Sequence, residues 1–192
     1  MSNPIVVFVE HTGGQARRAS LECLGAAHQT GHPVVAVVTG AGAEAVAGTL
    51  GNHGAAKAIA ITGADTYSPD QTATDVANIA KEQSAAGFLC AATSNGKDLA
   101  ARVSAHLDST LFTDCIELAA DGDSFKITRP WMAGKALATM KSSSPVLCAT
   151  TRLNVFEVQT TGGSAEVQTV AASADRKVEV VEIAVNISTA RW

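Results

Sequence analysis

Four short runs of apolar, mostly β-branched residues alternate with helical segments over the first 107 residues, and this alternation constrains the fold most strongly. The runs are 4–10 (PIVVFVE), 33–40 (PVVAVVTG), 57–62 (KAIAIT) and 87–91 (GFLCA). The alanine-rich helical segments are 19–30, 43–52, 68–83 and 95–107. Continuous apolar strands are buried on both faces, and strands that alternate with helices are joined by right-handed crossovers. The sequence therefore predicts an α/β fold, with a three-layer α/β/α, nucleotide-binding-like (Rossmann-like) parallel sheet.

After Leu107 the pattern changes to consecutive strands. Segments 109–118, 123–130 and 145–151 are predicted strands, so we expect a β-hairpin or meander to extend the sheet. Residues 160–175 are small and polar, which predicts a loop or mobile linker. Residues 176–185 (RKVEVVEIAV) alternate and are predicted to pair as an edge strand. We divide the chain into an α/β amino-terminal domain, 1–157, and a linker with that edge strand, 158–192.

The charge pattern and the length of the apolar runs exclude several classes of function. The formal net charge is −4 and there is no basic stripe, so nucleic acid is not expected as a partner. No apolar run approaches the roughly 20 residues that a spanning helix needs, so membrane insertion is not expected. The start of the chain, MSNP, has neither a secretory nor a transit pattern, which predicts a cytoplasmic protein.

Cysteines and histidines give no sign of a metal or redox site. Cys23, Cys90, Cys115 and Cys148 lie far apart in the sequence, and each is flanked by apolar residues. This spacing provides neither a CxxC pair nor a zinc knuckle, so buried, unreactive thiols are expected. The 5 histidines lack HxxxH and HxH spacing, and no metal site is predicted.

The turn before helix 95–107 is a weak candidate for anion or nucleotide binding. Ser94, Asn95 and Gly96 lie where unpaired N–H groups at a helix start favour an anion. Asn95 is also expected to cap the helix, in a box-like arrangement with Asp98. The glycine pattern is neither GxGxxG nor a P-loop, and the charge of Asp98 disfavours a phosphate. Structural capping and anion binding are the two alternatives.

Two further stretches also have two interpretations each. His11, in the turn EHTGG after strand 4–10, is either a catalytic base or a polar turn residue. Segment 129–140 (RPWMAGKALATM) lines a pocket or a subunit contact, or it is a strand in which Gly134 permits close backbone approach. Neither GxSxG nor SxxK is present, and no catalytic residue is predicted.

Four motifs, in this order and spacing, resemble the alpha (large) subunit of electron-transfer flavoproteins. They are PIVVFVEH with its glycine turn, ATSNGKDLAARVSAHLDSTLFTDC, RPWMAGKALATM and TTRLNVFE. The marker residues are Glu10, His11, Gly96, Asp98, Leu99, Ala100, Asp114, Arg129, Ala133, Gly134, Ala138, Thr139, Arg152 and Phe156. The resemblance covers about residues 4–157 and is to the amino-terminal domain of that subunit.

The resemblance implies one subunit of an alpha/beta heterodimer that carries electrons on one FAD. Electrons would pass from primary flavin dehydrogenases to a membrane quinone oxidoreductase or another acceptor. The resemblance also implies that this domain packs against the beta subunit, while a second alpha-subunit domain makes most FAD contacts through SGGRG, QVGQTG-like and SGAIQH-like motifs. None of these motifs occurs here. We therefore expect the FAD-binding domain to be absent from this chain, and the chain alone to bind no cofactor.

Three hypotheses for function follow. The first is a scaffold and subunit-interface domain without its own catalytic site, in which FAD held elsewhere performs the redox chemistry. The second is a stand-alone adenine-nucleotide-binding module that uses the turns at 10–14 and 93–98. The third, an enzyme that uses Cys90 or His11, has the least support.

Overall fold

The alternation of strands and helices is confirmed in the computed structural model, which describes residues 2–174, 176–178 and 180–182. The helices are α1 (Arg18–Gln29), α2 (Ala43–Ala47), α3 (Pro69–Glu82) and α4 (Ser94–His106), with a 3-10 helix, η1 (Leu50–His53). The main sheet contains β1 (Ile5–Val9), β4 (Val34–Thr39), β5 (Lys57–Thr62), β6 (Gly87–Ala91), β7 (Leu111–Cys115), β11 (Leu147–Thr151) and β12 (Glu166–Ala171). A second sheet contains β8 (Glu117–Asp121), β9 (Ser124–Trp131) and β10 (Ala136–Lys141), and β2 (His11–Thr12) pairs with β3 (Gln15–Ala16).

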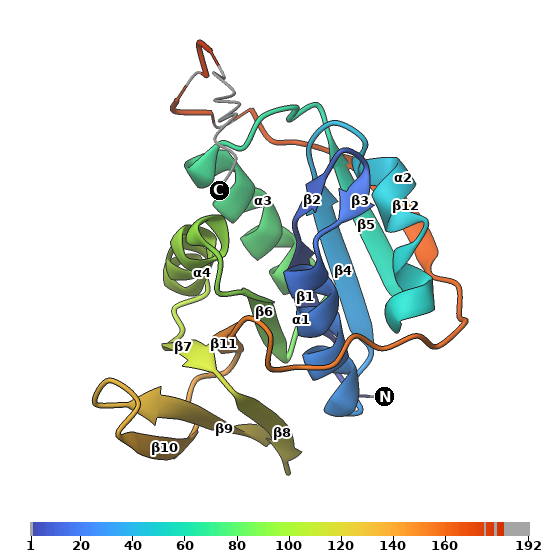
Figure 1. The fold of residues 1–192 in the computed structure, drawn as a ribbon. Helices are drawn as coiled ribbons and strands as arrows, with labels where there is room; N and C mark the ends of the chain where they lie inside the picture. The colour runs from blue at the N-terminus through green and yellow to red at the C-terminus, as the bar shows by residue number, and fades with distance from the viewer. Residues whose placement is uncertain (1, 175, 179, 183–192) are drawn as a thin grey trace, which may run out of the picture.

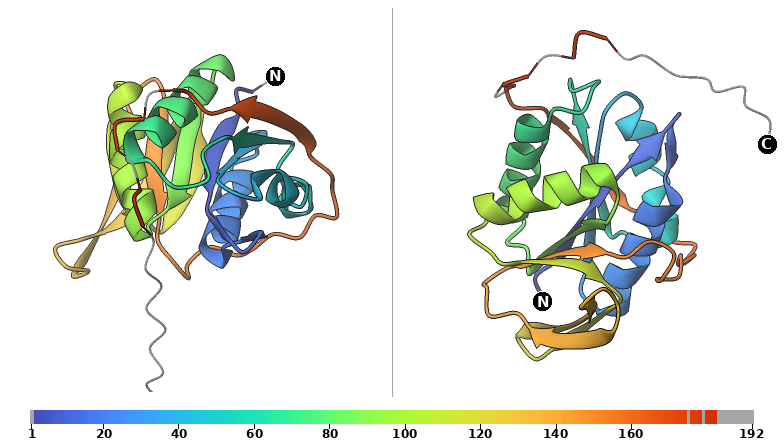
Figure 2. Two further views of the ribbon diagram at one scale, coloured as in Figure 1. Left: turned by 90° about the horizontal axis from the view of Figure 1, so that it is seen from above. Right: turned by 60° about the vertical axis from the view of Figure 1, so that its left-hand side comes forward.

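β1 lies at the centre of a seven-stranded parallel sheet with the order β12-β5-β4-β1-β6-β11-β7 (Figure 1). Ile5, Val7 and Val9 pack in the cluster that contains residues of α1 and α2. Val6 and Phe8 pack in the opposite cluster, with residues of α3 and α4. Helices therefore cover both faces of the sheet, as Figure 2 also shows, which explains the continuous apolar run of β1. The predicted three-layer, Rossmann-like fold is confirmed.

An antiparallel meander is present, but it forms a sheet of its own with the order β10-β9-β8. Of the segments expected in it, 145–151 is instead β11, which pairs in parallel with β6 and β7 in the main sheet. The predicted strand 109–118 is divided between the two sheets. Asp114 has a φ of +60°, and the pairing of β7 with β11 shifts register at this point. The N–H of Ile116 then donates to the carbonyl of Thr128 on β9, at 2.8 Å. A bulge of this kind bends a strand, and here it directs the chain from the parallel sheet into the antiparallel one.

The segment after β11 contains a strand within the range 160–174, where a loop or linker was predicted. It crosses α1 and η1 and ends in β12, which pairs in parallel with β5 at the far edge of the sheet (Figure 1). Two glycines allow the crossing: an added Cβ at Gly25 would lie 2.1 Å from the carbonyl oxygen of Glu157, and one at Gly51 would lie 2.1 Å from the nitrogen of Ala165. β12 is largely exposed, so its polar sequence lacks the apolar pattern of a buried strand.

One edge strand of the sheet is therefore β12, which begins 10 residues before the predicted edge strand at 176–185. Residues 176–178 and 180–182 are not in a strand. The remaining positions of that prediction, 179 and 183–185, lie outside the described residues. The alternation of Val and Glu in this segment resembles an exposed strand, but β5 is already paired on that side by β12.

Candidate functional site at the carboxyl ends of the strands

The carboxyl ends of β1 and β6 flank the point where the strand order reverses. The chain proceeds from β1 to β4 and β5 on one side, and then returns to β6 on the other side of β1. Open α/β sheets bind ligands in the crevice outside the carboxyl ends of strands at such a point. A cavity of about 330 Å³ lies here, lined by Glu10, His11, Tyr67 and Asn95 among others. This position makes it the candidate functional site.

Glu10, the residue after β1, extends its side chain across this crevice. Its carboxylate accepts a hydrogen bond from the hydroxyl of Thr93, which follows β6. The other carboxylate oxygen pairs with Arg17 at 3.1 Å. The Glu10 side chain is only 9% exposed, although it is charged. Its backbone N–H donates to the hydroxyl of Ser20 on α1 at 2.9 Å, which fixes the start of the side chain.

The same threonine caps α4. The Thr93 hydroxyl accepts a hydrogen bond from the N–H of Gly96 at 2.9 Å, so the N-cap is Thr93. The predicted capping by Asn95 is wrong, because Asn95 lies inside the helix, one residue after its first. The start of a helix carries about half a positive charge, and the Glu10 carboxylate, linked through Thr93, already lies beside it. An anion from solution would compete with this internal carboxylate.

The three candidate anion-binding residues do not converge on one cavity. Gly96 is buried, whereas Ser94 and Asn95 are exposed. Of the three, only Asn95 lines the 330 Å³ cavity, while Ser94 and Asn95 both line a neighbouring cavity of about 530 Å³. The glycine at position 96 is explained by packing instead, because an added Cβ would lie 2.0 Å from the carbonyl oxygen of Ala91. The glycine thus permits close packing of α4 on the end of β6.

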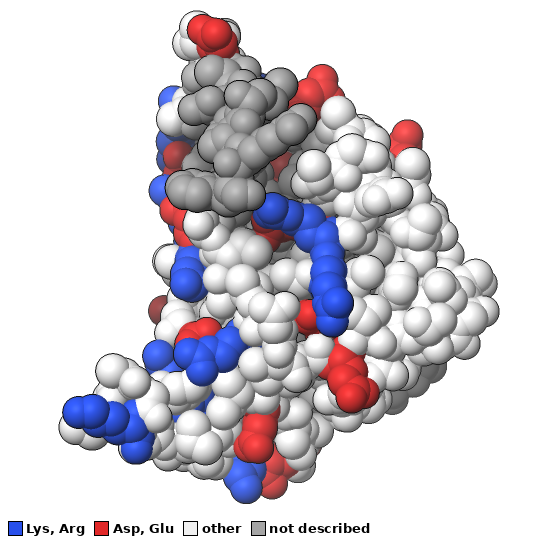
Figure 3. Space-filling view, in the orientation of Figure 1, with Lys and Arg blue, Asp and Glu red and all other residues white. Residues whose placement is uncertain are grey.

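The charged side chains that line the cavity are those of Glu10, Arg17 and Asp65. Figure 3 shows Lys and Arg atoms over the start of α1, next to Asp and Glu atoms, while the side of β5 and α2 is mostly uncharged. Arg17 pairs with Glu10, and Arg18 pairs with Glu22 at 3.0 Å. Arg17, which lines the cavity, is therefore already neutralised by a carboxylate of the chain itself, whereas Lys97, which lines a neighbouring cavity at the start of α4, forms no ion pair with any residue that the structure describes.

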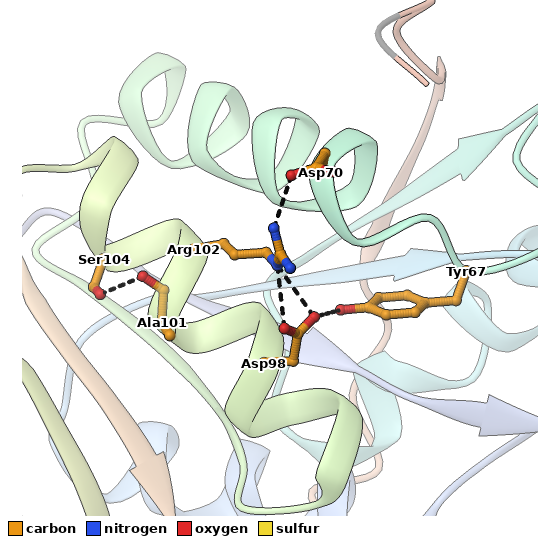
Figure 4. A network of polar contacts seen from close by, with 6 residues as sticks. All are labelled: Tyr67, Asp70, Asp98, Ala101, Arg102 and Ser104. Atoms are coloured by element: carbon orange, nitrogen blue, oxygen red, sulfur yellow. Dashed lines mark hydrogen bonds and ion pairs between the residues drawn. The ribbon is translucent and has the colours of Figure 1, made fainter. Parts of the chain in front are cut away.

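Asp98 takes part in a network that the sequence analysis missed. Figure 4 shows the Tyr67 hydroxyl donating to Asp98 at 3.1 Å, and Arg102 bridging Asp98 and Asp70 at 3.2 and 2.7 Å. Burial raises the pKa of Tyr67, and the adjacent Asp98 carboxylate raises it further. This network ties the loop before α3 to α4. The only signal in the sequence was the spacing of Asp98 and Arg102 by four residues, which places them on one face of a helix.

His11 and Cys90, the residues of the enzyme hypothesis, make structural contacts. His11 Nε2 lies 2.9 Å from the carbonyl oxygen of Thr39, and because a carbonyl only accepts, Nε2 carries the proton. His11 Nδ1 is buried without a hydrogen-bond partner among the described residues. The Cys90 thiol donates to the carbonyl of Gly96 at 3.1 Å, and burial raises its pKa well above the ordinary value. A nucleophilic thiol needs the opposite shift.

All four cysteines are buried and free, as predicted. Across residues 2–174, 176–178 and 180–182, no group of three or more His, Cys, Asp or Glu residues is placed to hold a metal ion. Within the same ranges, no helix has the length and apolar character needed to cross a bilayer.

Comparison with known proteins identifies close sequence similarity to one family. The family model described as "Electron transfer flavoprotein domain" matches residues 5–175. The electron transfer flavoprotein subunit alpha of Syntrophomonas wolfei is 33% identical over 190 residues, which are 96% of this chain and 60% of that protein. The subunit alpha of Pseudomonas aeruginosa is 33% identical over 175 residues, 89% of this chain and 55% of that protein. The probable mitochondrial subunit alpha of Caenorhabditis elegans is 29% identical over 183 residues, 94% and 54% respectively. The chain thus spans between half and three-fifths of these relatives.

Proposed function

Because the chain belongs to the electron transfer flavoprotein family, we propose that it is a scaffold and subunit-interface domain of an alpha subunit. In this proposal it works in the cytoplasm as part of an alpha/beta heterodimer that carries FAD. The heterodimer takes electrons from primary flavin dehydrogenases and delivers them to a quinone oxidoreductase or another acceptor. The domain positions its neighbours and performs no chemistry with its own side chains.

The single observation that carries this proposal is that Glu10, a charged side chain of the chain itself, crosses the crevice. A nucleotide-binding sheet normally leaves the first turn after its central strand free for phosphates. Here that space holds the Glu10 carboxylate, fixed by Thr93 and Arg17. The fold is therefore that of a nucleotide-binding domain, while the residues at its usual binding point contact one another.

The residues at the crevice do not fit FAD. The pyrophosphate of a dinucleotide binds best at a helix start with free N–H groups and without neighbouring negative charge. At α4, the N–H of Gly96 is bonded to Thr93, and Glu10 supplies a negative charge next to it. This supports a flavin site outside the crevice.

The alternative, an adenine-nucleotide-binding module, would use the remaining cavity. Tyr67, Asn95 and His11 line it and could contact a base or ribose. The carboxylates of Glu10 and Asp65 also line it, however, and both disfavour a phosphate. The scaffold function fits this set of charges better.

Reconstitution with a beta subunit tests the proposal. The purified chain is mixed with the electron transfer flavoprotein beta subunit of the same organism and analysed by size-exclusion chromatography, with absorbance followed at flavin wavelengths. We expect a one-to-one complex, and we expect the chain alone to remain colourless after incubation with FAD. No complex at tens of micromolar, or stoichiometric flavin on the isolated chain, would contradict the proposal.

A further inference from the structure

The antiparallel sheet carries an apolar stripe that starts in the core and continues beyond it. Alternate residues of a strand share a face. On β9, Phe125 and Ile127 share a face and are buried in the cluster that includes α1. On the same face, Arg129 is half-buried, and Trp131 is 52% exposed. The face that covers the core at one end is therefore uncovered at the other.

The other side of this hairpin end is apolar as well. The register pairs Trp131 with Ala136 and Pro130 with Leu137, so Leu137 lies on the face opposite Trp131. Leu137 is 65% exposed, and Met132 in the connecting turn is 69% exposed. Scattered exposed apolar residues are ordinary, but several large ones on both sides of one projecting hairpin (Figure 1) mark an interaction site.

The turn holds these side chains outward at a conformational cost. Met132 and Ala133 have φ values of +50° and +57°, in the left-handed region that non-glycine residues rarely adopt. Such backbone conformations cost free energy and are found preferentially where function requires them. The guanidinium carbon of Arg129 lies 5.6 Å from the centre of the Trp131 ring and stacks on it. The turn and the stacking together hold the apolar end in a fixed arrangement.

The hairpin is basic, although the chain as a whole has a net charge of −4. Between Ser124 and Lys141 every ionisable side chain is a cation. Lys141 pairs with Asp121 at 3.1 Å. Lys126, Arg129 and Lys135 form no ion pair with any residue that the structure describes. Figure 3 shows Lys and Arg atoms at this end of the molecule, at the lower left.

We propose that the hairpin β9–β10 is a docking arm that inserts into the partner subunit of the proposed function, on which this inference rests. The partner surface should be an apolar pocket bordered by Asp and Glu side chains. Apolar side chains on both faces are covered only by a pocket that encloses the arm, and three unpaired cations are best matched by carboxylates. A second copy docking through the same arm would bring like charges together, which disfavours it.

Two double variants and a matched control test the arm in the complex with the beta subunit. The first, Trp131→Ser with Leu137→Ser, removes the apolar end. The second, Lys126→Glu with Lys135→Glu, reverses its charge. The control is Val167→Ser on β12, where the exposed fraction of 46% is similar but the position is at the far edge of the sheet.

We expect the apolar variant to weaken the complex at least tenfold. The charge variant should slow association, by a factor that shrinks at high salt. The control should bind like the wild type, and all three should keep the wild-type melting temperature. Hydrogen exchange on the wild-type complex gives a reading that does not depend on variants: we expect strong protection at 126–141.

The outcomes separate the two proposals. If the wild-type chain forms no complex, the proposed function fails, and the arm fails with it. If the complex forms but the variants bind normally, or if 126–141 gains no protection, the arm is refuted while the proposed function stands. The arm is equally refuted if the apolar variant abolishes only binding to anionic phosphatidylserine vesicles, or only self-association of the chain. In those cases the hairpin binds a lipid surface or a second copy of the chain, and not the partner subunit.

Discussion

The hydroxyl of Thr93 donates a hydrogen bond to the carboxylate of Glu10 across the point where the strand order of the parallel sheet reverses. The two residues are 83 positions apart in the sequence; Glu10 directly follows β1, and Thr93 lies two residues after the end of β6. The contact joins β1 to the start of α4 and places a negative charge where related folds place a phosphate. This internal contact is the basis for assigning a scaffold role to a nucleotide-type sheet.

Removing the carboxylate should make the crevice attract anions. In Glu10→Ala, Arg17 loses its partner and the start of α4 loses the neighbouring negative charge. We expect the affinity for inorganic phosphate, measured by calorimetry, to rise at least tenfold over the wild type. Glu10→Gln, which keeps the size of the side chain, should give a smaller rise. Equal and negligible heats for all three proteins would show that Glu10 does not control the crevice.

The cap of α4 can be located by two alanine variants. Thr93→Ala removes the acceptor for Gly96 and the donor to Glu10, so the free energy of unfolding should fall by about 1–2 kcal/mol. Asn95→Ala, at the position that the sequence suggested, should change it by less than about 0.5 kcal/mol, because Asn95 is exposed. Urea denaturation measures both. If Asn95→Ala lowered the free energy of unfolding more than Thr93→Ala did, Asn95 would be the cap.

Gly96, in the first turn of α4, and Gly48, the C-cap of α2, should respond in opposite ways to alanine. In Gly96→Ala the new methyl group would lie 2.0 Å from the carbonyl oxygen of Ala91, so we expect a loss of about 1–3 kcal/mol. In Gly48→Ala the nearest atom outside the adjoining residues is 3.5 Å away and the backbone is helical, so stability should be unchanged or slightly higher. Thermal melting of both variants decides whether Gly96 is present for packing.

The buried thiols make stability depend on alkaline pH. Burial raises the pKa of Cys23, Cys115 and Cys148 from 9.0 to about 12. Above pH 9 these thiols lose their protons in the unfolded chain but keep them in the folded one, so stability falls as pH rises from about 9 to about 12. Each thiol contributes a slope of up to about 1.4 kcal/mol per pH unit. Urea denaturation from pH 8 to 10.5 should show a shallower slope in Cys23→Ala than in the wild type, and parallel slopes would contradict this account.

The parallel core could be predicted because its determinants are local. The β-branched run at Ile5–Val9 and the glycine that ends α1 at Gly31, with a φ of +78°, each indicate their structure within a few residues. The exposed strand β12 could not be predicted in the same way. It is stabilised by pairing with β5, more than 100 residues earlier in the chain, and its exposed side chains need no apolar pattern.

The site was only partly predictable for the same reason. The sequence indicated a turn at Ser94–Gly96, but the capping residue precedes that turn and its partner, Glu10, comes from another strand. The pairing of Tyr67 with Asp98 likewise joins residues 31 positions apart. No periodicity or spacing rule relates such residues, because the fold alone brings them together. The motif at 129–140 includes Trp131. The sequence did not indicate that this side chain is exposed, or which face of the strand is uncovered.

Calorimetric titration of the wild-type chain with AMP and with ATP is the most direct test of whether the crevice is closed. The Glu10 carboxylate and its hydrogen bond to Thr93 predict no binding heat up to millimolar nucleotide. Stoichiometric, micromolar binding of either nucleotide would contradict the account, because it would show that the sheet still serves a ligand of its own.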